Sequence, residues 1–79
     1  TVEEFLGEIE RIVESGTRLD LSYYVDELVD PYNQEDILDY FREAESDSID
    51  EALDELGEEE YSEVDIRLMR IKYLSDVGN

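Results

Sequence analysis

Several kinds of residue and segment are missing from this 79-residue chain. It has no cysteine, so it can form neither a disulfide framework nor a thiolate metal site. It has no histidine either, which leaves carboxylates, tyrosines, hydroxyls and one lysine as the only candidate catalytic groups. We therefore predict no active site, no bound metal and no cofactor, and expect that the chain itself is not an enzyme.

Long apolar runs are also absent. The longest runs span only a few residues, which excludes a membrane-spanning helix, and the N-terminal residues lack the pattern of a signal peptide. We expect a soluble, cytoplasmic chain with no membrane partner.

Acidic residues dominate the charge. The sequence has 25 acidic and 6 basic residues, giving a formal net charge of −19. A field of this sign repels phosphate backbones and anionic membranes, so binding of this chain to bare DNA is expected to be weak or absent. Because 41% of the residues are hydrophobic and recur at helical spacing, the chain is expected to fold despite its charge, as a single helical domain over residues 1–79.

Two helices are predicted in the first part of the chain. Thr1 and Glu4 have the spacing of a capping box, and apolar residues at helical spacing predict a helix from Val2 to Glu14, which ends at Ser15-Gly16. A second, shorter helix is predicted over Leu19–Val29, with either Asp20 or Ser22 as cap. The apolar residues at helical spacing in it are Leu21, Tyr24, Val25, Leu28 and Val29.

The third helix has two candidate starts. Either Asp30 caps it with Pro31 in the first position, or Asn33 caps it with Asp36 three positions on, and it ends near Glu45. Ser48 and Glu51 form a further capping box, so a fourth helix is predicted over Ile49–Leu56, followed by Gly57.

The segment Tyr61–Leu74 is predicted to be the helix around which the others pack. Ser62 is its N-cap, and its apolar residues fall on two opposite sides. Tyr61, Val64, Leu68 and Ile71 form one side, and Ile66, Met69 and Tyr73 form the other. The fold class is therefore an all-α bundle of four to five short helices. Because four short helices are expected to be too few to cover both sides, we hypothesise a homodimer. It would use either the Ile66, Met69 and Tyr73 side or the exposed apolar side of the first helix.

Residues 57–71, GEEEYSEVDIRLMRI, resemble the closing motif of the helix-turn-helix domain at the C-terminal end of many bacterial RecQ-type ATP-dependent DNA helicases. Thr1-Val2-Glu3 with Leu6 is similar to the start of that domain's recognition helix. Leu19-Asp20-Leu21 with Leu28-Val29-Asp30 is similar to the segment after it. The resemblance covers nearly all 79 residues, although most of its motifs are caps and apolar spacings.

The resemblance implies a partial helix-turn-helix that starts at the recognition helix, as a non-catalytic C-terminal piece of a helicase. ATP, Mg²⁺ and the DNA-unwinding machinery for recombination and repair would lie upstream in the parent protein, which would provide most of the DNA contact. The DNA-facing positions would be Thr1, Glu3, Glu4 and Gly7. Two glutamates among them disfavour phosphate contacts.

Two other functions stay open from the sequence. Asp47-Ser48-Ile49-Asp50 resembles the attachment site of acyl carrier proteins, in which the serine carries phosphopantetheine, although Ser48 is already accounted for as a helix cap. The chain could also be a free-standing acidic module that binds a protein partner. The acidic residues Glu45, Asp47, Asp50, Glu51 and Asp54 lack the pattern of a calcium loop and are interpreted as a solvated face. The six tyrosines are interpreted as residues at the rim of the core.

Overall fold

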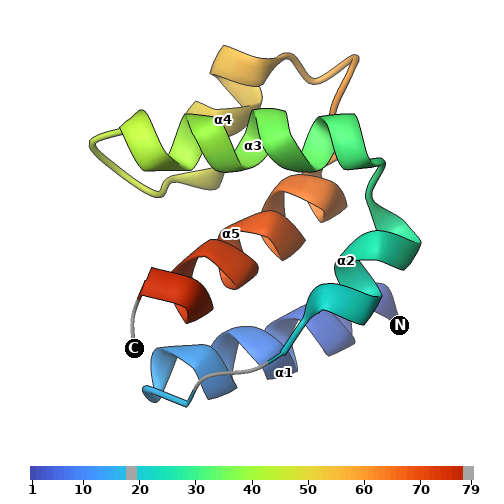
Figure 1. Cartoon of the computed structure of the whole chain (residues 1–79), viewed down its shortest axis with the longest axis vertical. Coiled ribbons are helices and arrows are strands. Elements are labelled where there is room, and N and C mark those ends of the chain that lie inside the picture. Colours follow the sequence, from blue (N-terminus) through green and yellow to red (C-terminus); the bar gives the residue numbers. More distant parts are fainter. Residues whose placement is uncertain (18–19, 78–79) are drawn as a thin grey trace.

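A computed structural model describes residues 1–17 and 20–77 of the chain, and these residues form five helices in a small bundle (Figure 1). The helices are α1 (Val2–Glu14), α2 (Ser22–Leu28), α3 (Pro31–Glu43), α4 (Ile49–Leu56) and α5 (Glu63–Val77). No strand occurs in the described residues, so the predicted all-α bundle is confirmed.

Helix α5 is the centre of the bundle. In Figure 1 it runs between α1 and α2 on one side and α3 and α4 on the other, and it contacts all four. Its buried residues are Ile66, Leu68, Met69, Ile71 and Ser75. Because these residues lie on opposite sides of the helix, α5 needs a layer of cover on each side, as its pattern predicts.

The three N-caps at the starts of α1, α4 and α5 are confirmed. Each side-chain oxygen accepts a hydrogen bond from the backbone N–H three residues on: Thr1 Oγ1 from Glu4 at 3.2 Å, Ser48 Oγ from Glu51 at 3.3 Å, and Ser62 Oγ from Asp65 at 3.1 Å. Such bonds satisfy amides that have no partner within their own helix, which is why these helices begin where the sequence predicts.

The start of α3 follows the first of its two candidates. Pro31 occupies the first turn, and Asp30 Oδ1 accepts a hydrogen bond from the Tyr32 N–H at 2.9 Å. The helix ends at Glu43, slightly before the predicted Glu45. The first turn of α3 also contacts the end of α2. The Gln34 side chain donates to the Val29 carbonyl oxygen at 2.8 Å, and this bond satisfies a carbonyl that has no partner within α2.

Helix α2 is shorter than predicted. It begins at Ser22, whereas the predicted start at Leu19 lies outside the described residues. Asp20 precedes the helix and accepts a hydrogen bond from the Ser22 N–H at 3.1 Å, which lowers the pKa of the Asp20 carboxyl. Helix α5 continues to Val77, one turn beyond the predicted Leu74.

The glycines after α1 and α4 lie at positive φ. Gly16 and Gly57 both have φ of 96°, a region that other residues rarely adopt. This conformation ends each helix where the sequence predicts a stop.

The core is one continuous cluster to which all five helices contribute. Two polar contacts tie α5 and its lead-in to the outer helices: Arg67 Nη2 lies 3.1 Å from Glu10 Oε1 on α1, and Tyr61 Oη donates to Asp36 Oδ2 on α3 at 2.7 Å. Both contacts join residues that are far apart in sequence. No helix in the described part of the chain is long and apolar enough to cross a membrane.

Candidate functional site

The residues predicted to face DNA lie together at the start of α1. Thr1, Glu3 and Glu4 are exposed, and Gly7 is half-buried with open space where a Cβ would stand. Thr1 uses its hydroxyl to cap the helix. The only cation on α1, Arg11, lies 3.5 Å from Glu8. The face that would approach a duplex therefore has no cation without a carboxylate beside it.

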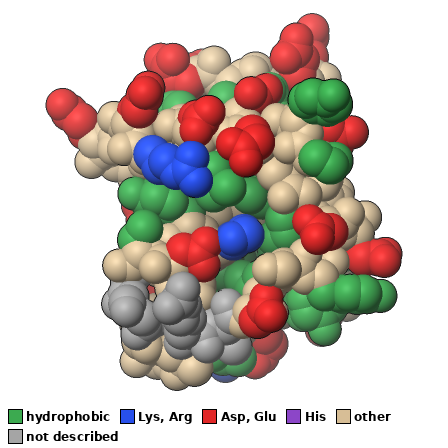
Figure 2. All heavy atoms as spheres, in the orientation of Figure 1, with side chains coloured by type: hydrophobic (Ala, Val, Ile, Leu, Met, Phe, Trp, Pro, Cys, Tyr) green, Lys and Arg blue, Asp and Glu red, His purple; other side chains and the backbone are tan. Residues whose placement is uncertain are grey.

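Every basic side chain in the described residues lies within 4 Å of a carboxylate. The pairs are Arg11–Glu8 (3.5 Å), Arg42–Asp39 (2.9 Å), Arg67–Glu10 (3.1 Å), Arg70–Asp47 (3.2 Å) and Lys72–Asp76 (2.8 Å). Acidic side chains spread over the face shown in Figure 2. Phosphate recognition depends on clustered cations, and this arrangement provides none in residues 1–17 and 20–77.

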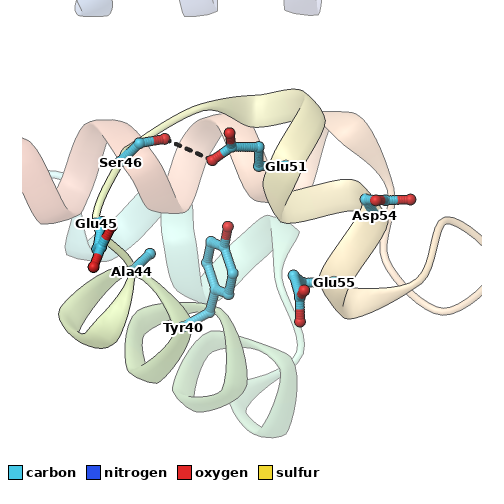
Figure 3. Close-up of a pocket in the computed structure, with 7 residues that line it drawn as sticks. All are labelled: Tyr40, Ala44, Glu45, Ser46, Glu51, Asp54 and Glu55. Atoms are coloured by element: carbon cyan, nitrogen blue, oxygen red, sulfur yellow. Dashed lines mark hydrogen bonds between the residues drawn. The ribbon is translucent and has the colours of Figure 1, made fainter.

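A hollow of about 440 Å³ lies between α3 and α4 (Figure 3). Its lining residues are Tyr40, Ala44, Glu45, Ser46, Glu51, Asp54 and Glu55. The Tyr40 side chain points into it, and Ser46 Oγ donates to Glu51 Oε2 at 2.8 Å. Burial raises the pKa of the Tyr40 phenol, and the nearby carboxylates of Glu51 and Glu55 raise it further.

The chemistry of this hollow is that of an acidic surface. Three of its carboxylates come from one face of α4, and no group of three acidic side chains in the described residues has the geometry of a metal site. All five residues interpreted from the sequence as a solvated face are exposed: Glu45, Asp47, Asp50, Glu51 and Asp54.

Ser48 is positioned by its role as a helix cap. It is half-buried, its Oγ accepts from the Glu51 N–H, and its own N–H donates to Ser46 Oγ at 3.2 Å. Helices α2 and α3 fill the connection between α1 and α4, where acyl carrier proteins have a long loop. No observation here favours Ser48 as an attachment site for phosphopantetheine, and the carrier hypothesis stays an untested alternative.

The predicted interface on α5 is covered within the single chain. Ile66 and Met69 have no exposed surface, and Tyr73 is half-buried with its ring stacked on Phe41 at a centroid distance of 6.0 Å. The expectation that this side is left open to a second copy is therefore wrong. The Cα radius of gyration of 11.7 Å is close to the roughly 12 Å typical of a domain this long, so four short helices suffice to cover α5.

The sequence analysis expected an exposed apolar side on the first helix, but it missed the exposed apolar residues of α2. On α2, Val25 is buried, whereas Tyr24 is 43% exposed and Leu28 is 48% exposed, although all three have helical spacing. Val2 on α1 is 48% exposed. We refer to Val2, Phe5, Tyr23, Tyr24 and Leu28 together as the α1–α2 patch. In Figure 2, hydrophobic side chains gather at the lower right, over α2 and the start of α1.

The tyrosines divide into three groups. Tyr61 is buried, and Tyr40 and Tyr73 are half-buried at the edge of the core, as interpreted from the sequence. Tyr23, Tyr24 and Tyr32 are 69%, 43% and 84% exposed, so the core-rim interpretation is wrong for Tyr23 and Tyr32, and Tyr24 lies at the surface with its ring against Phe5. One signal in the sequence could have indicated the exposure of Tyr24, because the acidic Glu27 lies one turn after it on α2.

Comparison with known proteins adds no relative: no family model matches the chain, and no curated protein matches it. The resemblance to the RecQ-type C-terminal domain is carried by the residues described above.

Proposed function

We propose that this chain is a non-catalytic helical accessory domain of a RecQ-type ATP-dependent DNA helicase, and that it acts through protein contact instead of gripping DNA. The observation that carries the proposal is the pairing of the cations, because each of the five described basic side chains lies beside a carboxylate. In addition, the outer face of α1 bears Glu3, Glu4 and Glu8.

This arrangement disfavours a DNA-binding role for physical reasons. Duplex binding is driven largely by cations that neutralise phosphates and release counterions. Here a phosphate would have to displace a carboxylate from its arginine or lysine, in the field of a chain with net charge −19. Protein contact has no such requirement.

The resemblance supports the place of the domain in a larger protein. Residues 57–71 span the link before α5 and most of that helix, and the capping and burial pattern on which the resemblance depends is present in the fold. In this proposal the ATP- and Mg²⁺-dependent unwinding of DNA belongs to upstream parts of the parent protein, and the parent works in the cytoplasm.

DNA binding is tested by fluorescence anisotropy with a labelled duplex and a labelled single strand. We expect no binding at physiological salt up to about 100 µM protein, the weak end of ordinary non-specific binding. A dissociation constant at or below the micromolar range for the unaltered chain, with a steep salt dependence, would contradict the proposal.

The helicase assignment is tested separately on the parent open reading frame, which should encode helicase motifs upstream of this segment. Their absence would leave a second candidate, the free-standing acidic protein-binding module, which the exposed α1–α2 patch favours. Deleting residues 1–79 from the parent should preserve its ATP-dependent unwinding while removing contact with a partner.

A further inference from the structure

The α1–α2 patch is continuous across two helices. Val2 and Phe5 lie one turn apart on α1, and Tyr24 and Leu28 lie one turn apart on α2. The Phe5 and Tyr24 rings join the two helices, with centroids 5.1 Å apart and planes at 54°, and Tyr23 meets the edge of Tyr24 at 5.6 Å. The apolar surface is therefore one strip and not scattered single residues.

The strip remains accessible although the core beneath it is closed. Val25 on α2 and Leu21 just before that helix are 0% and 4% exposed, and α2 contacts α5. Tyr24 and Leu28 are 43% and 48% exposed. Clustered exposure of aromatic and aliphatic side chains marks interaction sites, because isolated domains rarely leave such strips uncovered.

The rim of the strip is acidic. Glu3 and Glu4 follow Val2 on α1, and Asp26 and Glu27 precede Leu28 on α2, all of them exposed. Neither residues 1–10 nor residues 20–30 contain a lysine or arginine. A partner that covers the strip must therefore place positive charges beside these carboxylates. An acidic partner would be repelled by them.

We propose that the α1–α2 patch docks a basic amphipathic helix of a protein partner. Apolar residues on one face of that helix, at spacings of three and four, would cover Phe5, Tyr24 and Leu28, and flanking lysines or arginines would meet the carboxylates of the rim. A second copy of this chain fits less well, because it brings another net charge of −19. This inference rests on the proposed protein-contact function and names the chemistry of the partner.

The test uses a defined probe. A fluorescein-labelled peptide of about 18 residues, with leucines on one helical face and lysines elsewhere, is titrated with the whole chain at moderate salt and followed by anisotropy. A peptide of the same composition with its leucines scrambled is the control. We expect the amphipathic peptide to bind about tenfold more tightly or better, because only it can cover the strip.

Two variants with the same added charge locate the binding site. Leu28→Asp places a carboxylate in the strip and should weaken binding about tenfold or more. Val77→Asp adds the same charge at a residue that is 60% exposed at the C-terminal end of α5, on the opposite side of the view in Figure 1 from α2, and should leave binding within about twofold. Circular dichroism confirms that both variants remain folded.

Each remaining outcome decides against the proposal. Equal binding of the two peptides, or equal effects of the two variants, would mean that charge alone drives binding. Loss of self-association in Leu28→Asp during sedimentation, with no peptide preference, would mean that a second copy occupies the strip. Neither result bears on DNA binding. The proposed function is therefore tested separately, by the anisotropy experiment with labelled DNA.

Discussion

Replacing Leu68 by alanine tests most directly whether α5 is the shared core of the bundle. Leu68 is 0% exposed and lies on the helix that contacts all of the others. Truncating a fully buried leucine removes its burial energy and leaves a cavity, which together cost about 3 kcal/mol within a range of roughly 2 to 5.

That loss is large compared with the whole fold. A domain of 79 residues has a total stability of about 4 to 12 kcal/mol at ordinary values per residue. Leu68→Ala should therefore remove about a quarter of the stability if the total is about 12 kcal/mol, and most of it if the total is about 4 kcal/mol. The matched control is Leu28→Ala, which truncates a side chain that is 48% exposed and should cost about 0.5 kcal/mol or less.

Urea unfolding followed by far-ultraviolet circular dichroism measures both effects at one fixed salt concentration. With a denaturant slope of about 1 kcal/mol per molar, a cost of about 3 kcal/mol lowers the midpoint of Leu68→Ala by about 3 M, while that of Leu28→Ala should change by about 0.5 M or less. A cost below about 1 kcal/mol for Leu68→Ala would refute the central position of α5. Equal costs in the two variants would refute the free α1–α2 patch.

Three further predictions concern the caps, the buried tyrosine and the charge. Ser48→Ala should cost about 1 kcal/mol in thermal unfolding and Ser48→Asp almost nothing, since aspartate also caps; equal losses would contradict the cap. Tyr61→Phe should cost about 1 kcal/mol by removing the bond to Asp36. That bond, with burial, raises the pKa of Tyr61 from 10.0 to about 12. The phenol's contribution is therefore complete below about pH 10 and lost as pH rises towards 12, so the variant and the unaltered chain should converge in stability over that interval. In sedimentation equilibrium the chain should be monomeric at low salt and self-associate, if at all, only at high salt, where its negative charges are screened; a dimer that strengthens at low salt would contradict this charge argument.

The starts of the helices could be predicted because their causes are local. The caps at Thr1, Ser48 and Ser62 act through amides only three residues away, and Gly16 and Gly57 end their helices through their own backbone angles. The boundaries of α1 and α4 therefore agree with the sequence to the residue. The start of α3 could be narrowed to two candidates, and the chain uses the one with proline in the first turn.

The candidate interaction surface could not be predicted in the same way. Tyr24 and Leu28 share the helical spacing of Val25, yet only Val25 is buried. Periodicity identifies the apolar side of a helix but not how much of that side a neighbouring helix covers. The short α2 contacts α5 and buries only Val25, while its Tyr24 ring meets the Phe5 ring of α1.

By itself, the sequence determined that this chain is helical and where most of its helices begin. It also determined that α5 is apolar on two sides and that the surface of the protein is strongly acidic. Each of these features follows from local spacing, capping or composition. Only the tertiary structure decided which apolar residues stay outside. It buried Ile66 and Met69 and left Tyr24 and Leu28 open, because coverage depends on how the helices pack in space, and that packing joins residues far apart in the chain.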